Sequence, residues 1–363
     1  MTPKEQHKIM KQIVEESIPL PDYRDREFCI GPIAHYSWWH EERATLETDR
    51  GPWSSSNDIF RAAGRRELKW AKTYAKPRVP YERLYREIYD FRQVSPESHI
   101  QNLSDYLKLA QCLGFKPGNP LDRPVMRHPN FQPNNILVSK SNEIVGLIGW
   151  QHSSILPLGL AAGIPSHFQN YGDPDSERLA EPQINLPPDF DSLDPSEQSS
   201  IRETMRKRLV HFLYATFTKR LNEEHYSAIV DQPVILHQRL FKAAGTPWEG
   251  DSITLRAEMI RATQNWQTLF TEDSINSDKG TCTAPPFQYP DTVIQNTLQV
   301  DTQQKEADTA VEEMRDILNV DVLEAAREKA GQIKGRMLEV AETPRDVTAV
   351  QEHFRFDDFD EKA

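Results

Sequence analysis

Residues 128–138 hold the side chains whose types and spacing come nearest to a reaction centre. His128 is followed by one amide, Asn130, two positions later and by a second amide, Asn135, seven positions later. With a carboxylate at the middle position, this spacing would suit phosphoryl transfer, in which the acid takes a hydroxyl proton and the asparagine binds magnesium. An amide can hydrogen-bond an alcohol but cannot take its proton at neutral pH. The segment therefore lacks the base, and we expect His128 to pack and to hydrogen-bond the backbone.

A second acid is missing a short distance downstream. Residues 143–152 indicate a β-strand that runs into a loop, and they resemble the strand that delivers the magnesium-binding aspartate in kinase-fold phosphotransferases. In that pattern an aspartate precedes Trp-Gln-His, whereas here Gly149 precedes Trp150, Gln151 and His152. Glycine has no side-chain oxygen, and magnesium depends on oxygen ligands. The loss of both acids argues against phosphoryl transfer.

Several blocks together resemble the fungal aminoglycoside-phosphotransferase-like family, of the type named for altered inheritance of mitochondria. The blocks span roughly residues 28–175, and their joint match is specific although each alone is weak. They lie at residues 28–32, 39, 42–44, 49–53, 128–138, 150–158, 162–165 and 169–174.

The resemblance implies a kinase-like fold that lacks one of its two lobes. Relatives carry an N-terminal lobe with a glycine-rich phosphate loop and a Val-Ala-x-Lys strand, and neither pattern precedes residue 28. The expected fold is mainly α with small β-hairpins, a protein-kinase-like or aminoglycoside phosphotransferase C-lobe without the nucleotide-binding N-lobe. This C-lobe is expected over residues 1–300, with a flap-like loop at 171–198. A C-terminal helix and an acidic tail are expected over 301–363.

Composition limits the classes of partner. The chain has 363 residues, with 43 Lys plus Arg against 55 Asp plus Glu, a net charge of −12. Such a charge argues against binding to nucleic acid or to an anionic membrane surface. No apolar run is long enough to span a membrane. The three cysteines are far apart and indicate neither a disulfide framework nor a zinc site, so a reducing cytoplasm is expected.

Hydrophobic periodicity predicts the main elements. A hairpin is expected over residues 135–139 and 144–148, turning at Ser141 and Asn142. Residues 271–300 are expected to be irregular, and the chain after 340 to be a frayed tail. Helices are expected near the N-terminus around Ile9–Val14 and over residues 57–76, 81–93, 96–114, 199–222, 251–270 and 303–330.

The candidate site follows from the resemblance. Asn130 and Gln151 are predicted as catalytic positions that make polar contacts to a substrate, with no metal and no cofactor. For Trp39, a role in the core is the default alternative. The predicted substrate-binding residues are Trp38, Trp39, His40, Asn135, Gly149, Trp150 and His152.

Three functions from different classes remain open. The first choice is an acceptor cleft repurposed for an apolar small molecule, as a cofactor-free cyclase or pericyclase (a Diels–Alder-type step) in fungal secondary metabolism. The alternative is a catalytically dead pseudokinase scaffold or regulator. An active small-molecule kinase is least favoured. A missing lobe would leave an apolar face, which a second copy in a homodimer could cover.

Overall fold

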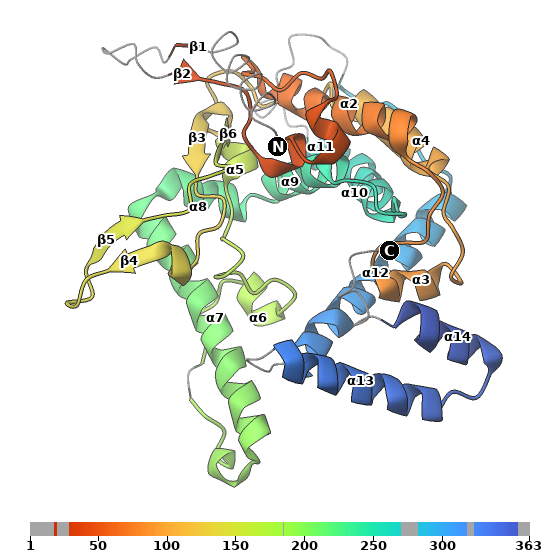
Figure 1. The fold of residues 1–363 in the computed structure, drawn as a ribbon. Coiled ribbons are helices and arrows are strands. Elements are labelled where there is room, and N and C mark those ends of the chain that lie inside the picture. Colours follow the sequence, from red (N-terminus) through yellow and green to blue (C-terminus); the bar gives the residue numbers. More distant parts are fainter. Residues whose placement is uncertain (1–17, 20–28, 184, 270–281, 318–322, 355–363) are drawn as a thin grey trace. The chain divides into compact units, whose positions relative to one another are not determined.

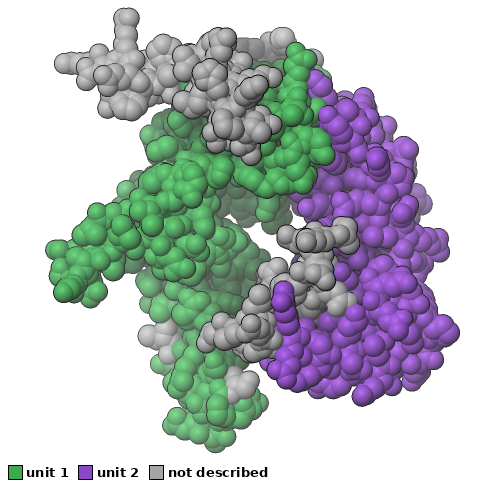
Figure 2. All heavy atoms as spheres, in the orientation of Figure 1, with its two compact units in different colours: residues 1–63, 110–242, 267–284 green, residues 64–109, 243–266, 285–363 purple. Residues whose placement is uncertain are grey.

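The computed structural model describes residues 18–19, 29–183, 185–269, 282–317 and 323–354, and it is mainly helical with three small antiparallel sheets (Figure 1). The chain divides into two compact units. Unit 1 comprises residues 1–63, 110–242 and 267–284, and unit 2 comprises residues 64–109, 243–266 and 285–363 (Figure 2). The units alternate along the sequence. Two of the boundaries between them fall inside helices, after residue 63 in α2 (Ser56–Tyr74) and after residue 242 in α9 (Gln232–Gly245). The helix expected around Ile9–Val14 lies outside the described residues.

Unit 1 contains all three sheets. In the first, β1 (Ile18–Pro19) pairs with β2 (Cys29–Ile30). In the second, β3 (Pro124–Arg127) pairs with β6 (Ser154–Pro157), so that Arg127 lies opposite Ser154.

The third sheet is the hairpin of β4 (Ile136–Val138) and β5 (Ile144–Leu147), with an irregularity between Leu137 and Val138. It confirms the hairpin predicted from the sequence.

The helices of unit 1 surround these strands. The long helix α7 (Pro195–Leu221) has Pro195 in its first turn, and Asp194 and Glu197 each accept the other's backbone N–H, which caps the helix. The other helices and 3₁₀ turns of this unit are η1 (Tyr36–Trp38), η2 (Glu41–Ala44), η3 (Pro120–Asp122), η4 (Pro133–Asn135), α5 (Leu158–Ala161), α6 (Pro174–Glu177), η5 (Phe190–Ser192), α8 (Glu223–Val230) and α11 (Trp266–Leu269).

Two apolar clusters lie in the core of the described part of unit 1. One joins α5 to α7 and α8, and the other joins the segment after β2 to the start of α2. The first comprises Leu158, Ala162, Ile164, Ala215, Ala228, Ile229 and Val234, and the second Ile33, Trp38, Ala62 and Ala63.

Unit 2 is built from helices. Fully buried side chains on α4 (Glu97–Leu109) and α10 (Ile253–Gln264) form its core, and a buried carboxylate on α12, Asp301, pairs with Arg261. Its remaining helices are α3 (Arg83–Ile88), α12 (Asp291–Ile317), α13 (Leu323–Glu339) and α14 (Pro344–His353).

Several expectations need correction. Residues 171–198 are not one loop, because α6 lies within them and α7 begins at Pro195. Residues 291–300 are helical, and the part of the tail at 344–353 is α14, begun by a capping box between Thr343 and Asp346. None of the described helices is both long and apolar enough to cross a membrane.

The cysteine expectation is also wrong. Cys112 and Cys282, both in unit 1, form a disulfide with their Cα atoms 5.8 Å apart. The two are separated by 170 residues, and such a pairing leaves no trace in local spacing. Disulfides are rare in cytosolic proteins, so the bond speaks against the expected reducing setting.

Candidate functional site

His128 serves the backbone of its own loop. Its Nδ1 accepts the backbone N–H of Asn130 at 3.2 Å, so the neutral ring carries its proton on Nε2 and donates it to the carbonyl of Ile148 at 2.7 Å. Both ring nitrogens are therefore occupied by backbone groups. This confirms the structural role predicted for His128.

The side-chain amides of Asn130 and Asn135 differ in their hydrogen bonds. The Asn135 side-chain amide donates to the carbonyl of Asn130 at 2.7 Å, and the backbone carbonyl of Asn135 accepts the N–H of Ile148 at 2.9 Å. The side chain of Asn130 is exposed, and within the described part of the chain it makes no hydrogen bond. The hydrogen bonds of Asn135 thus stabilise the loop, whereas the exposed side-chain amide of Asn130 is available to a ligand.

Gly149 occupies a position that would resist a side chain. Its φ is +86°, in the left-handed region that favours glycine, and a Cβ would lie 3.2 Å from the Asn135 amide. The indole N–H of Trp150 donates to the carbonyl of Leu147 at 3.0 Å. The Nδ1 of His152 lies 3.2 Å from the carbonyl of Ala34, and Gln151 between them is exposed. These contacts shape a turn between β5 and β6.

The predicted aromatic residues near position 39 are mostly structural. Trp38 is buried in the core cluster and lies 5.3 Å from the ring of Trp53. Trp39 donates its indole N–H to the carbonyl of Ile33 at 2.7 Å, and the Arg50 guanidinium lies 4.2 Å above its ring. These contacts fit the default core role of Trp39.

His40 is half-buried. Its ring lies 4.7 Å from that of Tyr36, and its Nδ1 is 3.6 Å from the carboxylate of Glu41. Across the described ranges, no three His, Cys, Asp or Glu side chains are placed to hold a metal ion.

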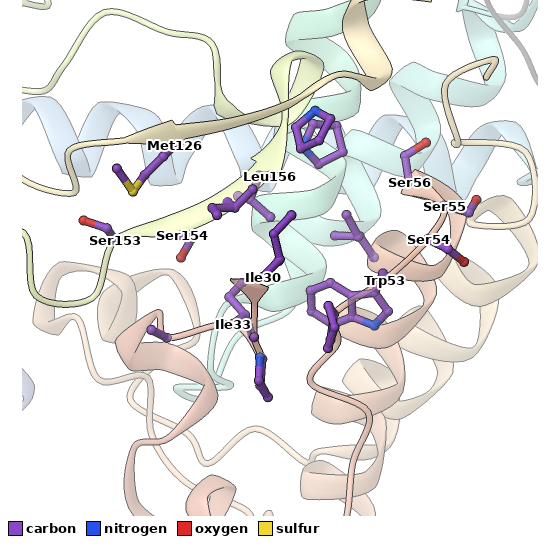
Figure 3. A pocket seen from close by; sticks show the side chains of 18 of the residues that line it. Ile30, Ile33, Trp53, Ser54, Ser55, Ser56, Met126, Ser153, Ser154 and Leu156 are labelled. Carbon is purple, nitrogen blue, oxygen red and sulfur yellow. The ribbon is translucent and has the colours of Figure 1, made fainter. Parts of the chain in front are cut away.

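A cavity of about 340 Å³ lies beside this region in unit 1, and we call it the serine cavity (Figure 3). None of the nine predicted site residues lines it. In Figure 3, Met126, Ser153 and Ser154 stand on one side, Trp53 and the serines at 54–56 on the other, and Ile30 and Ile33 between them. The lining comprises residues 30–34, 52–56, 59, 122, 124, 126 and 153–157.

Two polar groups in the wall of the serine cavity lack partners. The indole N–H of Trp53 and the hydroxyl of Ser154 are shielded from solvent and make no hydrogen bond to any residue that the structure describes. Ser56, by contrast, accepts the N–H of Phe115 at 2.8 Å. Asp122 is the one ionisable side chain among the described lining residues, so the wall is largely neutral.

Sequence reasoning missed these residues. The available signal was the run of serines at 54–56 directly after Trp53, which places several hydroxyls at the entrance to a helix. The pairing of β3 with β6, which brings Ser154 to the same cavity, depends on a long-range contact that no local pattern shows.

The last residue of β3, just before the predicted loop, contacts a histidine whose pKa is shifted. At the end of β3, Arg127 donates to the ring of buried His225 and, at 3.1 Å, to the carbonyl of Gly163. Burial of the His225 imidazole and the neighbouring Arg127 charge lower the pKa of His225 to about 4. Near neutral pH this histidine is therefore an uncharged acceptor that connects β3 to α8.

Comparisons with known proteins give distant fungal relatives. The chain is 27% identical over 326 residues to a protein of Aspergillus fumigatus named subtelomeric hrmA-associated cluster protein, and the match covers 82% of this chain and 61% of the relative. A protein of the same name from a second strain matches equally. The chain is 25% identical over 238 residues to altered inheritance of mitochondria protein 9, mitochondrial, of Vanderwaltozyma polyspora, which covers 63% of this chain and 35% of the relative.

These matches show fungal relatives of the chain, but they do not test the predicted kinase-like fold. The chain spans about three fifths of the length of the Aspergillus relatives. No protein-family model matches the chain, and no solved structure matches it. The sequence is therefore related to fungal proteins, one of which carries the altered-inheritance name, and the kinase-like C-lobe remains the prediction of the sequence resemblance.

Proposed function

We propose that the chain binds a small, largely apolar organic molecule in the serine cavity. The observation that carries the proposal is the pair of unpartnered polar groups, Trp53 Nε1 and Ser154 Oγ, in the wall of that cavity. A buried polar group left without a hydrogen bond costs about 1–3 kcal/mol. Both atoms are shielded in this structure, so a ligand would satisfy them after the two side chains rotate toward the cavity that they line. A volume of about 340 Å³ is in the usual range for small-molecule sites.

The ligand chemistry follows from the wall. Isoleucine, leucine, methionine and proline side chains supply apolar contact, and Trp53 supplies a single fixed donor. The Ser154 hydroxyl can donate or accept. A molecule with a carbonyl or ether oxygen on a hydrocarbon frame would satisfy both groups.

In its finer form, the proposal is a cyclisation without cofactor, of the pericyclic type. Holding a flexible substrate in its reactive conformer accelerates a unimolecular ring closure, and a hydrogen bond to a carbonyl stabilises charge that develops there. Trp53 and Ser154 would supply that bond inside the cavity. Asn130 and Gln151, whose side chains are exposed, do not line this cavity, and substituting them by alanine tests their predicted catalytic role.

The test compares two effects of the same substitutions, on the stability of the free protein and on its affinity for the ligand. Replacing Ser154 by alanine removes an unsatisfied hydroxyl, so the free protein should become more stable, by up to about 1 kcal/mol, while affinity for the ligand falls. Trp53→Phe should weaken binding about tenfold, because the indole N–H is lost. The exposed Ser166→Ala, outside the cavity, is the control.

Binding would be screened by ligand-observed NMR against oxygenated terpenoids and polyketides, and stability would be measured by urea unfolding. The proposal is wrong if no compound binds saturably, or if Ser154→Ala behaves like Ser166→Ala in both measurements. Binding without turnover in any hit would leave a binding protein and remove the cyclase. Turnover that survives Asn130→Ala and Gln151→Ala would remove those two positions from the reaction.

A scaffold without catalysis is the second candidate, and the β4–β5 hairpin favours it. Its apolar side chains are exposed, with Ile144 at 74%, Val145 at 65% and Val138 at 58%. Figure 1 shows the hairpin projecting from the rest of unit 1. A concentration of exposed apolar side chains of this kind usually marks a surface that binds another protein. A second copy of this chain, as in the predicted homodimer, is the partner we propose for it.

A further inference from the structure

A second cavity, of about 690 Å³, lies elsewhere in unit 1, and we call it the α9 cavity. Its wall combines residues 163–179 with His211 of α7, the end of α8 and one face of α9. None of its lining residues belongs to the serine cavity or to the predicted loop at 128–138. The volume is ample for a small organic molecule.

Charge in the α9 cavity opposes that of the whole chain. Three basic side chains, Arg178, Arg239 and Lys242, line it with one acid, Glu177, although the chain carries a net charge of −12. Arg178 lies 4.0 Å from the carboxylate of Asp175, so Arg239 is the cation on which the argument rests. Glu177 accepts the N–H of Gly172 at 3.1 Å. Arg239 makes no ion pair with any described residue. The wall therefore attracts an anion, and Arg239 offers it a planar guanidinium that matches a carboxylate with two parallel hydrogen bonds.

His211 adds a buried donor to the wall. It is completely buried, and its Nδ1 accepts the backbone N–H of Asn170 at 2.8 Å, so the neutral ring carries its proton on Nε2. Burial lowers the pKa of His211, which keeps the ring neutral near pH 7. The Nε2–H has no acceptor among the residues that the structure describes.

Tyr171 lines the cavity beside this histidine. Its ring lies 5.3 Å from the His211 ring at an interplanar angle of 84°. The Tyr171 side chain is 56% exposed, and exposed side chains change rotamer within nanoseconds. Tyr171 hydrogen-bonds the backbone of Ile164, so a ligand atom reaches the histidine once this bond opens and the tyrosine turns aside.

Aliphatic side chains and amides share the rest of the wall. The amides are those of Gln169, Gln232 and Gln238, and the Gln238 amide donates to the carbonyls of Gly159 and Ala162. The aliphatic side chains are Ile164, Leu179, Ile229, Val230 and Ile235. A molecule that matches the wall has an anionic head, an apolar body and a hydrogen-bond acceptor.

We infer that the α9 cavity binds a carboxylic acid with an apolar body, whose carboxylate pairs with Arg239. The cavity acts independently of the serine cavity, so each can be tested without the other. His211 adds specificity, because its buried N–H favours ligands that present an acceptor to it.

The test uses decanoate as the probe, decanol as its uncharged match and inorganic phosphate as an anion without a body. Calorimetry on the full chain should show saturable binding of decanoate, at least tenfold weaker binding of decanol, and weaker binding of phosphate. Arg239→Gln should weaken decanoate binding at least tenfold and leave decanol unchanged. Arg220→Gln, an exposed arginine outside the cavity, is the matched control.

Val230→Trp supplies a second variant that does not alter charge. Val230 is 41% exposed and lines the cavity, so a tryptophan there fills space without disturbing the core. Decanoate binding should be lost while the melting temperature is retained. The inference is overturned if decanoate does not bind saturably, if Arg239→Gln equals Arg220→Gln, or if phosphate binds as tightly as decanoate.

Discussion

Protonation of His225 bears directly on the stability of the fold. Burial and the adjacent Arg127 lower its pKa from 6.5 to about 4, so the folded chain takes up this proton later than the unfolded chain as pH falls. Between about pH 6.5 and pH 4 the unfolded state therefore binds more protons, and the free energy of unfolding must fall with falling pH. Burial also lowers the pKa of His211, His237 and His353, which act in the same direction.

Urea unfolding at a series of pH values checks this prediction. The share of His225 should be on the order of 2–3 kcal/mol, lost mostly between pH 6.5 and pH 4. His225→Gln keeps a hydrogen-bond acceptor for Arg127 but cannot titrate, so its stability should depend less steeply on pH over that window. An unchanged slope in this variant would mean that His225 is not a source of the acid sensitivity.

Among the elements, those with strong local signals were predictable from the sequence. The β4–β5 hairpin was predictable because apolar runs flank Asn142. This residue adopts the positive φ that asparagine tolerates in a turn. Helix α7 was found by its apolar periodicity, although its start at Pro195 was missed. Helix α14 was missed because the acidic composition of the tail outweighed a readable cap at Thr343 and Asp346.

The candidate site was less predictable than the fold. The sequence located the loop at 128–138 and the turn at Gly149, because their motif is continuous in the chain. It did not locate either cavity, since each wall combines segments that are distant in sequence and meet only on folding. Trp38 shows the same limit, because a tryptophan in a core cluster and one in a ligand pocket have the same local pattern.

The β4–β5 hairpin yields a prediction at the level of the element. Lysines at Ile144 and Val138, which pair across the two strands, should abolish any concentration-dependent self-association. Because both side chains are mostly exposed, the free energy of unfolding should change by no more than about 0.5 kcal/mol per site. Sedimentation velocity over a hundredfold concentration range measures the association.

Leu221→Lys is the matched control, since Leu221 is equally exposed at 78% but lies at the end of α7. It should leave association unchanged. If the hairpin variant sediments as the unaltered chain does at every concentration, the hairpin is not where copies of the chain meet, and the scaffold candidate loses its main support.

At the scale of the whole chain, the Cys112–Cys282 bond closes the longest covalent loop that the described structure contains. The two residues are 170 positions apart, and closing so long a loop removes many conformations from the unfolded chain. The expected contribution to the free energy of unfolding is on the order of 2–5 kcal/mol. Cys112→Ser should lower stability by that amount in urea unfolding, whereas Cys29→Ser leaves the bond intact and is the control.

Thiol counting gives an independent measurement of the same bond. Denatured but unreduced protein should titrate one thiol per chain, from Cys29, and reduced protein should titrate three. Three thiols before reduction, together with equal stability of Cys112→Ser and Cys29→Ser, would mean that the bond does not form in the purified protein. One thiol and a selective loss in Cys112→Ser would show that an oxidised pair, invisible in local spacing, holds unit 1 together, because both cysteines belong to that unit.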